Sequence, residues 1–242
     1  MRSLLRAPIA RLPGDIAMEL DPEEWGQIDL RAAGILEPQT TALFDRLLHP
    51  GDTVVDIGAH VGYHALRARR RIGETGRVVA IDPQPYNCHK LLTNAELNGF
   101  ANIIVIAAAV GAAAAFVPLK QQPRTDKSRL SLRGAGVNDG AGTFITPVVT
   151  LDWLFADQGI DRAALLKVDV EGYELEVLMG AAAILDRIDN IVLEILPGEE
   201  PARVRAIESR LRVAGFRLCD VAGGEWRLGV PTVENNVWGS RS

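Results

Sequence analysis

The residues best placed to do chemistry lie between Thr53 and Tyr63, where a run of β-branched residues ends in Asp56 and a loop with Gly58 and Gly62 follows. Glycine lets a backbone approach a ligand closely and takes positive φ at little cost. The free N–H groups at the start of the helix that follows favour an anionic group. The stretch therefore predicts the strand, turn and helix start with which an α/β protein holds a nucleotide-like cofactor.

A second acid, Asp82, ends the next predicted strand. An acid there can accept hydrogen bonds from ribose hydroxyls, in dinucleotide enzymes and in S-adenosylmethionine enzymes alike. The loop over residues 58–62 does not match the dinucleotide fingerprint G-x-G-x-x-G. A carboxylate at Asp56 would be misplaced beside a pyrophosphate but would attract a sulfonium or ammonium group. S-adenosylmethionine carries both groups and is the predicted cofactor. A nicotinamide-dependent oxidoreductase is the alternative.

Composition excludes several classes of protein. The chain has 242 residues, is 48% hydrophobic and carries a net charge of −5, which disfavours a nucleic-acid partner. No apolar run approaches the roughly 20 residues that span a bilayer, and residues 1–14 do not resemble a secretory signal. Cys88 and Cys219 lack metal-type spacing and are predicted to be buried thiols. The expected location is the cytoplasm, and the alanine, arginine and glycine content suggests a bacterial source.

Strand-like and helix-like segments alternate, which is typical of a doubly wound, mostly parallel sheet. The run 103–110 is apolar throughout, so we expect a central strand that is covered on both faces. Residues 112–146 break the pattern and are predicted to form a long loop. Strands are predicted over residues 53–57, 78–81, 103–110, 148–151, 165–170 and 190–196, with last strands over 216–219 and 237–238. Helices are predicted over residues 21–34, 37–48, 61–71, 85–98, 177–185 and 204–211.

The chain resembles the FkbM family of S-adenosylmethionine-dependent methyltransferases. Residues 55–63 resemble the first motif of that family, residues 81–87 the second, residues 150–152 the approach to its fourth strand, and residues 166–174 its most specific signature. His60 is a departure, because the family usually has asparagine at this place.

The resemblance implies a Rossmann-like class I methyltransferase fold, with a mostly parallel seven-stranded sheet and helices on both faces. It also implies methyl transfer, usually to a hydroxyl oxygen. The methionine part of the cofactor would lie against the first motif, the ribose against the second, and the adenine near residues 107–108. The residues expected to bind the cofactor are Asp56, Gly58, Ala59, His60, Gly62, Asp82, Pro83 and Ala108.

Removal of a proton from an alcohol asks for a general base within reach. Asp169 and Glu171 lie at the end of a predicted strand, and Glu194 is an isolated acid in an apolar one, so these three are the predicted catalytic residues. Two structural alternatives stay open: the first two acids could only cap the next helix, and Glu194 could only serve in an ion pair. Lys167 is expected to be partly buried and to need Asp169 or Glu194 as a partner.

His64 could face the cleft one helical turn after His60, but a position on the helix surface is favoured. No firm set of metal ligands is visible, so no metal is predicted.

Two parts of the chain are expected to have different roles. Residues 1–49 are interpreted as a helical extension that helps to form the acceptor site, and residues 50–242 as the cofactor-binding methyltransferase domain. The acceptor is expected to be the hydroxyl of a small molecule, which the resemblance limits to sugars, lipids and secondary metabolites. A basic run is either a solvated loop or a lid over an anionic acceptor; it comprises Lys120, Arg124, Lys127, Arg129 and Arg133. A binding module without catalysis is the remaining alternative.

Overall fold

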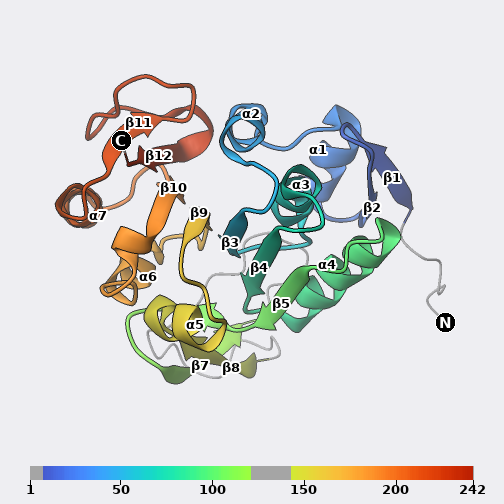
Figure 1. Cartoon of the computed structure of the whole chain (residues 1–242), viewed down its shortest axis with the longest axis horizontal. Helices are drawn as coiled ribbons and strands as arrows, with labels where there is room; N and C mark the ends of the chain where they lie inside the picture. The colour runs from blue at the N-terminus through green and yellow to red at the C-terminus, as the bar shows by residue number, and fades with distance from the viewer. Residues whose placement is uncertain (1–7, 121–142, 242) are drawn as a thin grey trace.

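The computed structural model describes residues 8–120 and 143–241, and its centre is a seven-stranded sheet (Figure 1). The strand order is β11-β12-β10-β9-β3-β4-β5, and β12 runs antiparallel to both of its neighbours while the other pairs are parallel. The predicted Rossmann-like, mostly parallel sheet is therefore confirmed. The strands are β3 (Thr53–Ile57), β4 (Arg77–Asp82), β5 (Ile103–Ala107), β9 (Ala163–Val168), β10 (Ile188–Glu194), β11 (Arg217–Asp220) and β12 (Asn236–Ser240).

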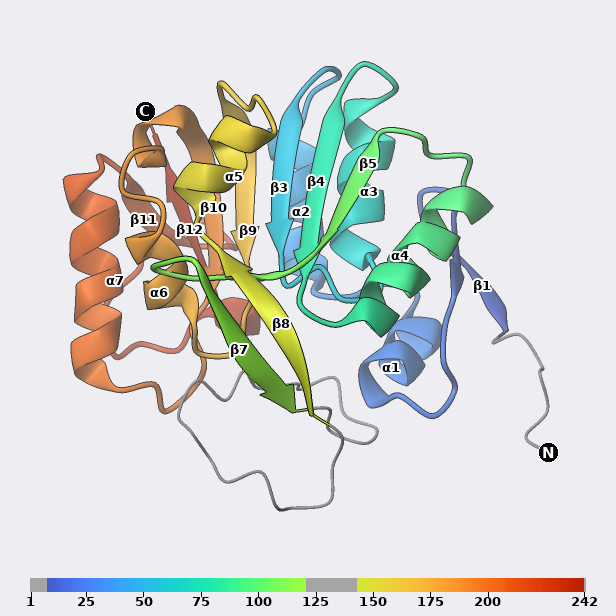
Figure 2. The ribbon, with the colours of Figure 1, turned by 90° about the horizontal axis from the view of Figure 1, so that it is seen from below.

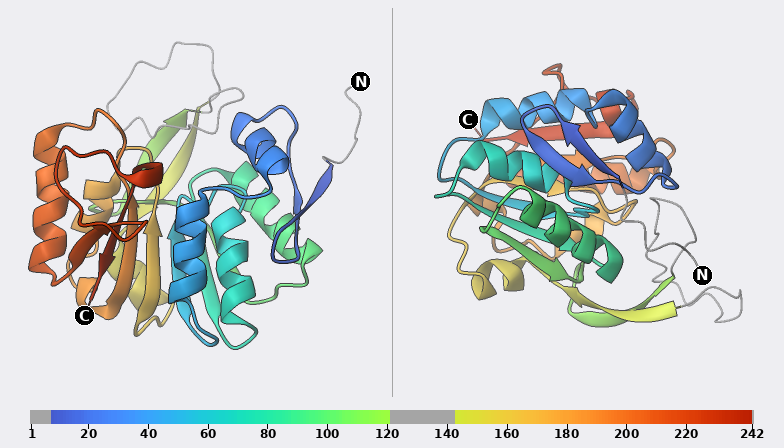
Figure 3. Two further views of the ribbon diagram at one scale, coloured as in Figure 1. Left: turned by 90° about the horizontal axis from the view of Figure 1, so that it is seen from above. Right: turned by 90° about the vertical axis from the view of Figure 1, so that its right-hand side faces the viewer.

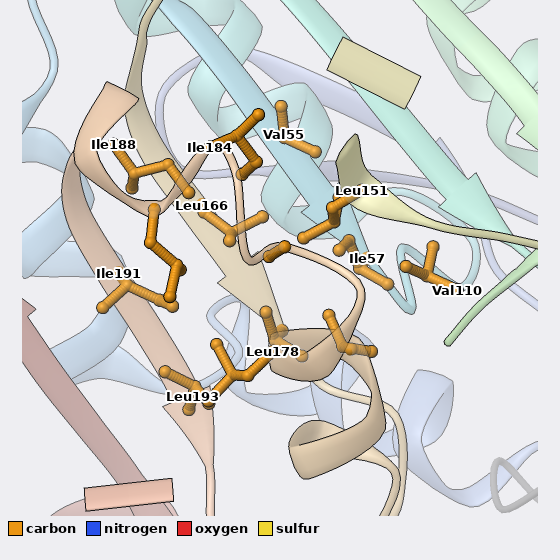
Figure 4. Packing of buried hydrophobic residues seen from close by; sticks show 14 of the residues in the cluster. Val55, Ile57, Val110, Leu151, Leu166, Leu178, Ile184, Ile188, Ile191 and Leu193 are labelled. Carbon is orange, nitrogen blue, oxygen red and sulfur yellow. The ribbon is translucent and has the colours of Figure 1, made fainter. Parts of the chain in front are cut away.

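Helices cover both faces of the sheet. Successive side chains of a strand point to opposite faces, so Val54 of β3 joins one buried cluster while Val55 and Ile57 join the other. The first cluster includes α2 (Pro38–Leu47), α3 (Tyr63–Ile72) and α4 (Pro85–Leu97). The second includes α5 (Leu151–Asp157), α6 (Glu174–Met179) and α7 (Pro201–Val213). Figure 4 shows this second cluster, where side chains of β3, β9 and β10 gather with Leu178 of α6.

The order of the strands across the sheet reverses at β3, which pairs with β4 on one side and with β9 on the other. In an open α/β sheet, ligands bind outside the carboxyl ends of the strands at such a reversal of strand order. Asp56, Asp82 and Glu194 lie in the last two residues of their strands, and Asp169 directly follows its strand. Figure 2 shows β10, β9, β3 and β4 side by side, and the topology therefore brings the predicted acids to one edge of the sheet.

The segment before β3, which was interpreted as a helical extension, also contains two β-strands. An antiparallel hairpin that the sequence analysis did not predict, β1 (Ile9–Leu12) with β2 (Ile16–Glu19), precedes α1 (Trp25–Ala33). The hairpin docks on α4, because the backbone N–H groups of Ala17 and Glu19 donate to Asn98 and Asn94 at 2.8 and 2.7 Å. The hairpin is drawn in dark blue in Figure 3, and its apolar side chains share a buried cluster with α3 and α4. The N-terminal segment is thus built into the core on one face of the sheet.

Two helices, α1 and α6, differ most from their predicted limits. α1 starts at Trp25 instead of residue 21, and its N-cap is Glu24, while Asp21 accepts a hydrogen bond from the backbone of Glu23. The predicted helix over residues 177–185 ends early, at Met179, and turns and a 3₁₀ helix, η1 (Leu185–Arg187), follow. A second 3₁₀ helix, η2 (Val233–Asn235), precedes β12.

The region after β4 also corrects the sequence prediction. The run 103–110 splits into β5 and β6 (Ala109–Val110), and β5 is an edge strand whose Ile104 is 37% exposed, so it is not central. Residues 112–146 are not only a loop, because β7 (Ala115–Lys120) and β8 (Thr143–Val149) pair with β6 in a three-stranded sheet of order β6-β8-β7. The basic run falls outside the described residues, apart from the backbone of Lys120. No helix in the described ranges is long and apolar enough to cross a bilayer.

Candidate functional site

A cavity of about 260 Å³ lies at the carboxyl edge of the sheet, where β3, β4, β9 and β10 end. Most of the residues predicted for the site line it, and Gly62 is the exception. From the predicted set, the lining residues are Asp56, Gly58, Ala59, His60, Asp82, Pro83, Ala108, Asp169, Glu171 and Glu194. The sequence analysis did not predict several other lining residues, among them Gln27 of α1, Glu37 before α2, His64 of α3 and Lys167 of β9.

Asp56 is the most deeply placed acid in this cavity. It is 1% exposed, and neither carboxylate oxygen has a hydrogen-bond partner among the described residues. Burial raises the pKa of Asp56, and the nearby Lys167 and His64 act in the opposite direction. A buried carboxylate without a hydrogen bond is costly. A cationic ligand in the cavity would offset that cost, so this side chain fits the sulfonium and ammonium groups of S-adenosylmethionine.

The loop after β3 depends on its glycines for close approach. Gly58 has φ +79°, and an added Cβ would lie only 1.7 Å from the carbonyl oxygen of Asp169. Gly62 is the N-cap of α3, and its added Cβ would lie 2.6 Å from Cγ of Leu91 in α4. Gly58 therefore lets two cavity loops touch. Gly62 packs the helix start against α4 instead of lining the cavity.

Asp82 joins the loops after β3 and β4. Its Oδ1 accepts hydrogen bonds from the backbone of Gln84 at 2.8 Å and the amide of Asn87 at 3.0 Å, and its Oδ2 accepts from the backbone of His60 at 3.0 Å. Burial raises the pKa of Asp82 to about 6, although these hydrogen bonds by themselves would lower it. Because each carboxylate oxygen has two lone pairs, Oδ2 can still accept from a ligand hydroxyl. Asp82 is thus both a turn residue and a candidate ribose ligand.

Lys167, Asp169 and Glu194 form a row across β9 and the end of β10. Nζ of Lys167, which is 2% exposed, lies 2.7 Å from Oδ2 of Asp169, so Asp169 is its partner. Burial by itself would lower the pKa of Lys167, but the surrounding carboxylates, Asp169 first, raise it above its ordinary value. Burial and the neighbouring acids raise the pKa of Glu194, which also shares a hydrogen bond with Asp169. Near neutral pH Glu194 is therefore protonated beside the ion pair of Lys167 and Asp169.

The turn after β9 is held by Glu174 and not by the two acids before it. Its Oε1 accepts from the backbone N–H groups of Val170 and Gly172 at 3.3 and 3.1 Å. Glu171 takes φ +55°, which is rare for a side chain of this size and is typical of functional turns. Tyr173, the N-cap residue of α6, makes no side-chain capping hydrogen bond to the helix. Asp169 and Glu171 both line the cavity.

His64 lies inside the protein, which corrects the expectation of a helix-surface position. It is 6% exposed, and its Nε2 lies 3.0 Å from Oε2 of Glu37. Burial opposes the charge on Glu37, but the hydrogen bond from His64 and the nearby Lys167 outweigh it and lower the pKa of Glu37 to about 2. The buried environment of His64 arises because residues of the N-terminal segment cover this face of α3.

We expect the cofactor-free protein to lose stability as the pH rises from 5 to 8. Burial raises the pKa of Glu174 from 4.5 to about 7 and that of Asp82 from 3.8 to about 6. A raised pKa means that the folded state binds the proton more tightly, so this stabilisation is complete below the unfolded value and is lost as the pH passes the folded one. For Glu174 the loss is about 2–3 kcal/mol. Glu37 changes charge only between about 2 and 4.5, below this window.

The matched variant is Glu174→Gln, which keeps an oxygen to accept from Val170 and Gly172 but cannot ionise. The free energy of unfolding, measured with urea at each pH, should fall less steeply between pH 5 and 8 for this variant than for the wild type. An equal pH dependence of the free energy of unfolding in both proteins would show that Glu174 does not titrate in this range.

The described residues contain no group of three or more His, Cys, Asp or Glu side chains that could hold a metal ion. Cys88 and Cys219 are free and buried, as predicted.

Comparison with known proteins agrees with this geometry. The profile of the methyltransferase FkbM domain matches residues 56–218. Hexuronic acid methyltransferase AglP of Haloferax volcanii is 24% identical over 214 residues, which cover 88% of this chain and 83% of that protein. Methyltransferase sdnD of Sordaria araneosa is 29% identical over 194 residues, which cover 68% and 73%. A SAM-dependent O-methyltransferase of Thermotoga maritima aligns with a TM-score of 0.50 at 10% identity, covering 98% of this chain and 78% of that one, a likeness of fold. With a match from Asp56 at the end of β3 to β11, the chain belongs to the FkbM family of S-adenosylmethionine-dependent methyltransferases.

Proposed function

We propose that this methyltransferase transfers the methyl group to a hydroxyl oxygen of a small molecule, and that the acceptor is a sugar of the uronic acid class. The observation that carries the proposal is the row of Lys167, Asp169 and Glu194 at the cavity. It holds the Asp169 carboxylate, paired to the ammonium of Lys167 at 2.7 Å, where it can take a proton from an alcohol. The similarity to a hexuronic acid methyltransferase supports the choice of acceptor.

Bound S-adenosylmethionine supplies a methyl group that its sulfonium has already activated. The protein then has two tasks, which are to align the acceptor oxygen and to take its proton. Asp56 would face the cationic part of the cofactor, while Asp82 would accept from the ribose hydroxyls. Asp169 would accept the proton of the acceptor hydroxyl, because Lys167 holds it in place and Glu194 already carries a proton. Glu171, in the same turn, is the second candidate base.

Thermal shift measurements separate this proposal from the nicotinamide alternative. S-adenosylhomocysteine should raise the melting temperature because a ligand that binds only the folded state stabilises it. NAD should leave it unchanged. A shift with NAD and none with S-adenosylhomocysteine would contradict the proposal.

The acceptor is tested with labelled S-adenosylmethionine and two matched sugars, a hexuronic acid and the corresponding neutral hexose. We expect label in the uronic acid product that survives alkali, since an ether resists hydrolysis and a methyl ester does not. Loss of the label in alkali would place the methyl group on the carboxylate. Binding of the cofactor without transfer to either sugar or to a small-molecule extract would favour a module without catalysis.

A further inference from the structure

We infer that Glu37 contacts the ammonium group of the cofactor's methionine moiety, so that a residue outside the FkbM domain match completes the cofactor site. This inference rests on the S-adenosylmethionine chemistry of the proposed function. It goes beyond it because the matched domain begins at residue 56 and assigns no role to the N-terminal segment.

The position of Glu37 is the first argument. It lines the cavity together with Asp56, Gly58 and Ala59 of the first motif. Its backbone takes φ 44° and ψ 70° at the N-cap of α2, and its side chain gives that helix no capping hydrogen bond. A left-handed glutamate is uncommon, and such conformations persist where the surrounding structure holds them, often at ligand sites. The strained backbone thus places a carboxylate at the cavity instead of on the helix end.

The orientation of the carboxylate is the second argument. Nε2 of His64 lies 3.0 Å from Oε2 of Glu37, and Asn236 at the start of β12, whose amide donates to Thr40, also helps to lower the pKa of this carboxyl. An ionised carboxylate offers about four lone-pair sites, so these two neighbours leave room for a ligand. His64 and Asn236 are 6% and 1% exposed, which makes them fixed supports. The carboxylate is therefore held in place before any ligand arrives.

The charge balance of the cavity is the third argument. Six carboxylates line the cavity, against one lysine among the described lining residues, Lys167, whose ammonium is already paired to Asp169. The carboxylates are Glu37, Asp56, Asp82, Asp169, Glu171 and Glu194. Asp56 lies deeper and is penalised by burial in its charged form, whereas Glu37 is kept ionised by His64 and Lys167. The Glu37 carboxylate is therefore already ionised when a cation enters this cavity.

The test compares ligands that differ in the group concerned. Calorimetry measures the affinity of S-adenosylhomocysteine, of its analogue without the amino group, and of methylthioadenosine. In Glu37→Gln we expect the affinity for S-adenosylhomocysteine to fall about 10- to 100-fold, as for loss of a charge-assisted hydrogen bond. The affinities for the two ligands without the ammonium group should not change. Equal weakening of all three ligands would overturn the inference.

His64→Gln is the matched variant, because it removes the ring that pairs with Glu37 and keeps the carboxylate. If Glu37 only anchors His64, both variants should weaken all three ligands alike. If Glu37 contacts the ligand, His64→Gln should retain most of the preference for the ammonium group.

A crystal structure of the wild type with S-adenosylhomocysteine keeps the inference testable even if a variant fails to fold. An ammonium nitrogen within hydrogen-bond distance of a Glu37 carboxylate oxygen, about 3 Å, supports it. An ammonium group bound elsewhere overturns it while leaving the proposed function intact. Failure of the wild type to bind S-adenosylhomocysteine would instead contradict the proposed function itself.

Discussion

Replacing Asp169 by asparagine is expected to lower kcat roughly 100- to 10,000-fold, the range for loss of a general base. Asparagine has the same size and still offers an oxygen to Nζ of Lys167, 2.7 Å from the aspartate in the wild type. It cannot take a proton from an alcohol. The affinity for S-adenosylhomocysteine should stay within a few-fold, because the change affects the proposed proton acceptor and not the first two motifs. Single-turnover rates and calorimetry measure the two quantities.

Two neighbouring acids serve as comparisons for Asp169. Because Glu194 is already protonated, Glu194→Gln replaces a neutral side chain by a neutral one and should cost less than tenfold in kcat. Glu171→Gln should also retain most of the activity if Asp169 is the base. An inactive Glu194→Gln with an active Asp169→Asn would move the base to Glu194. Asp186→Asn, at an exposed position of η1, is the control for a change of charge alone.

The strand-end acids could be predicted because their signals are local. A β-branched run that stops at an acid is visible around Asp56 and Asp82, and the carboxyl ends of parallel strands share one edge. Asp169 was predicted there by the same rule, whereas Glu194 was singled out as an isolated acid in an apolar strand, and the structure brings all four to one cavity. The ion pair between Lys167 and Asp169 also follows from burial, since a lysine inside a strand needs a partner.

The place of Glu37 in the cavity wall could not be predicted, because no local pattern links it to His64, 27 residues further along the chain. The same missing contact explains why His64 was expected on the surface. Its helix face looks exposed until α2 and the preceding residues are packed against it. The cavity side formed by the N-terminal segment therefore depends on tertiary packing.

Two errors in the fold have different causes. An apolar strand can be central or at an edge, and nothing within 103–107 distinguishes the two, so β5 was placed wrongly. The β1–β2 hairpin did carry a signal, because Pro13-Gly14 is a turn dipeptide and Gly14 and Asp15 take positive φ. Both strands have only four residues, which is too short for a clear alternation of polar and apolar side chains.

Gly58→Ala is expected to destabilise the protein by more than about 4 kcal/mol, in the range that only a defined structural conflict produces. The added methyl group would lie 1.7 Å from the carbonyl oxygen of Asp169, which is backbone and cannot rotate away. The backbone N–H of Asp169 donates to the carbonyl of Ile57 at 3.0 Å, so the same two segments are also tied by a hydrogen bond. Relief of the conflict would break that contact and move Asp169. Urea unfolding and S-adenosylhomocysteine binding measure both effects.

Gly159→Ala separates this conflict from the general cost of a left-handed backbone. Gly159 has φ +57°, and no atom lies within 4 Å of its added Cβ. This variant should lose only about 1–2 kcal/mol, the cost of placing an L-residue in that conformation. The difference between the two losses in free energy of unfolding then measures how closely the loop after β3 packs against the loop after β9. Similar losses in both would mean that the loops can separate freely. In that case the cofactor side and the base side of the cavity would not be held as one rigid unit.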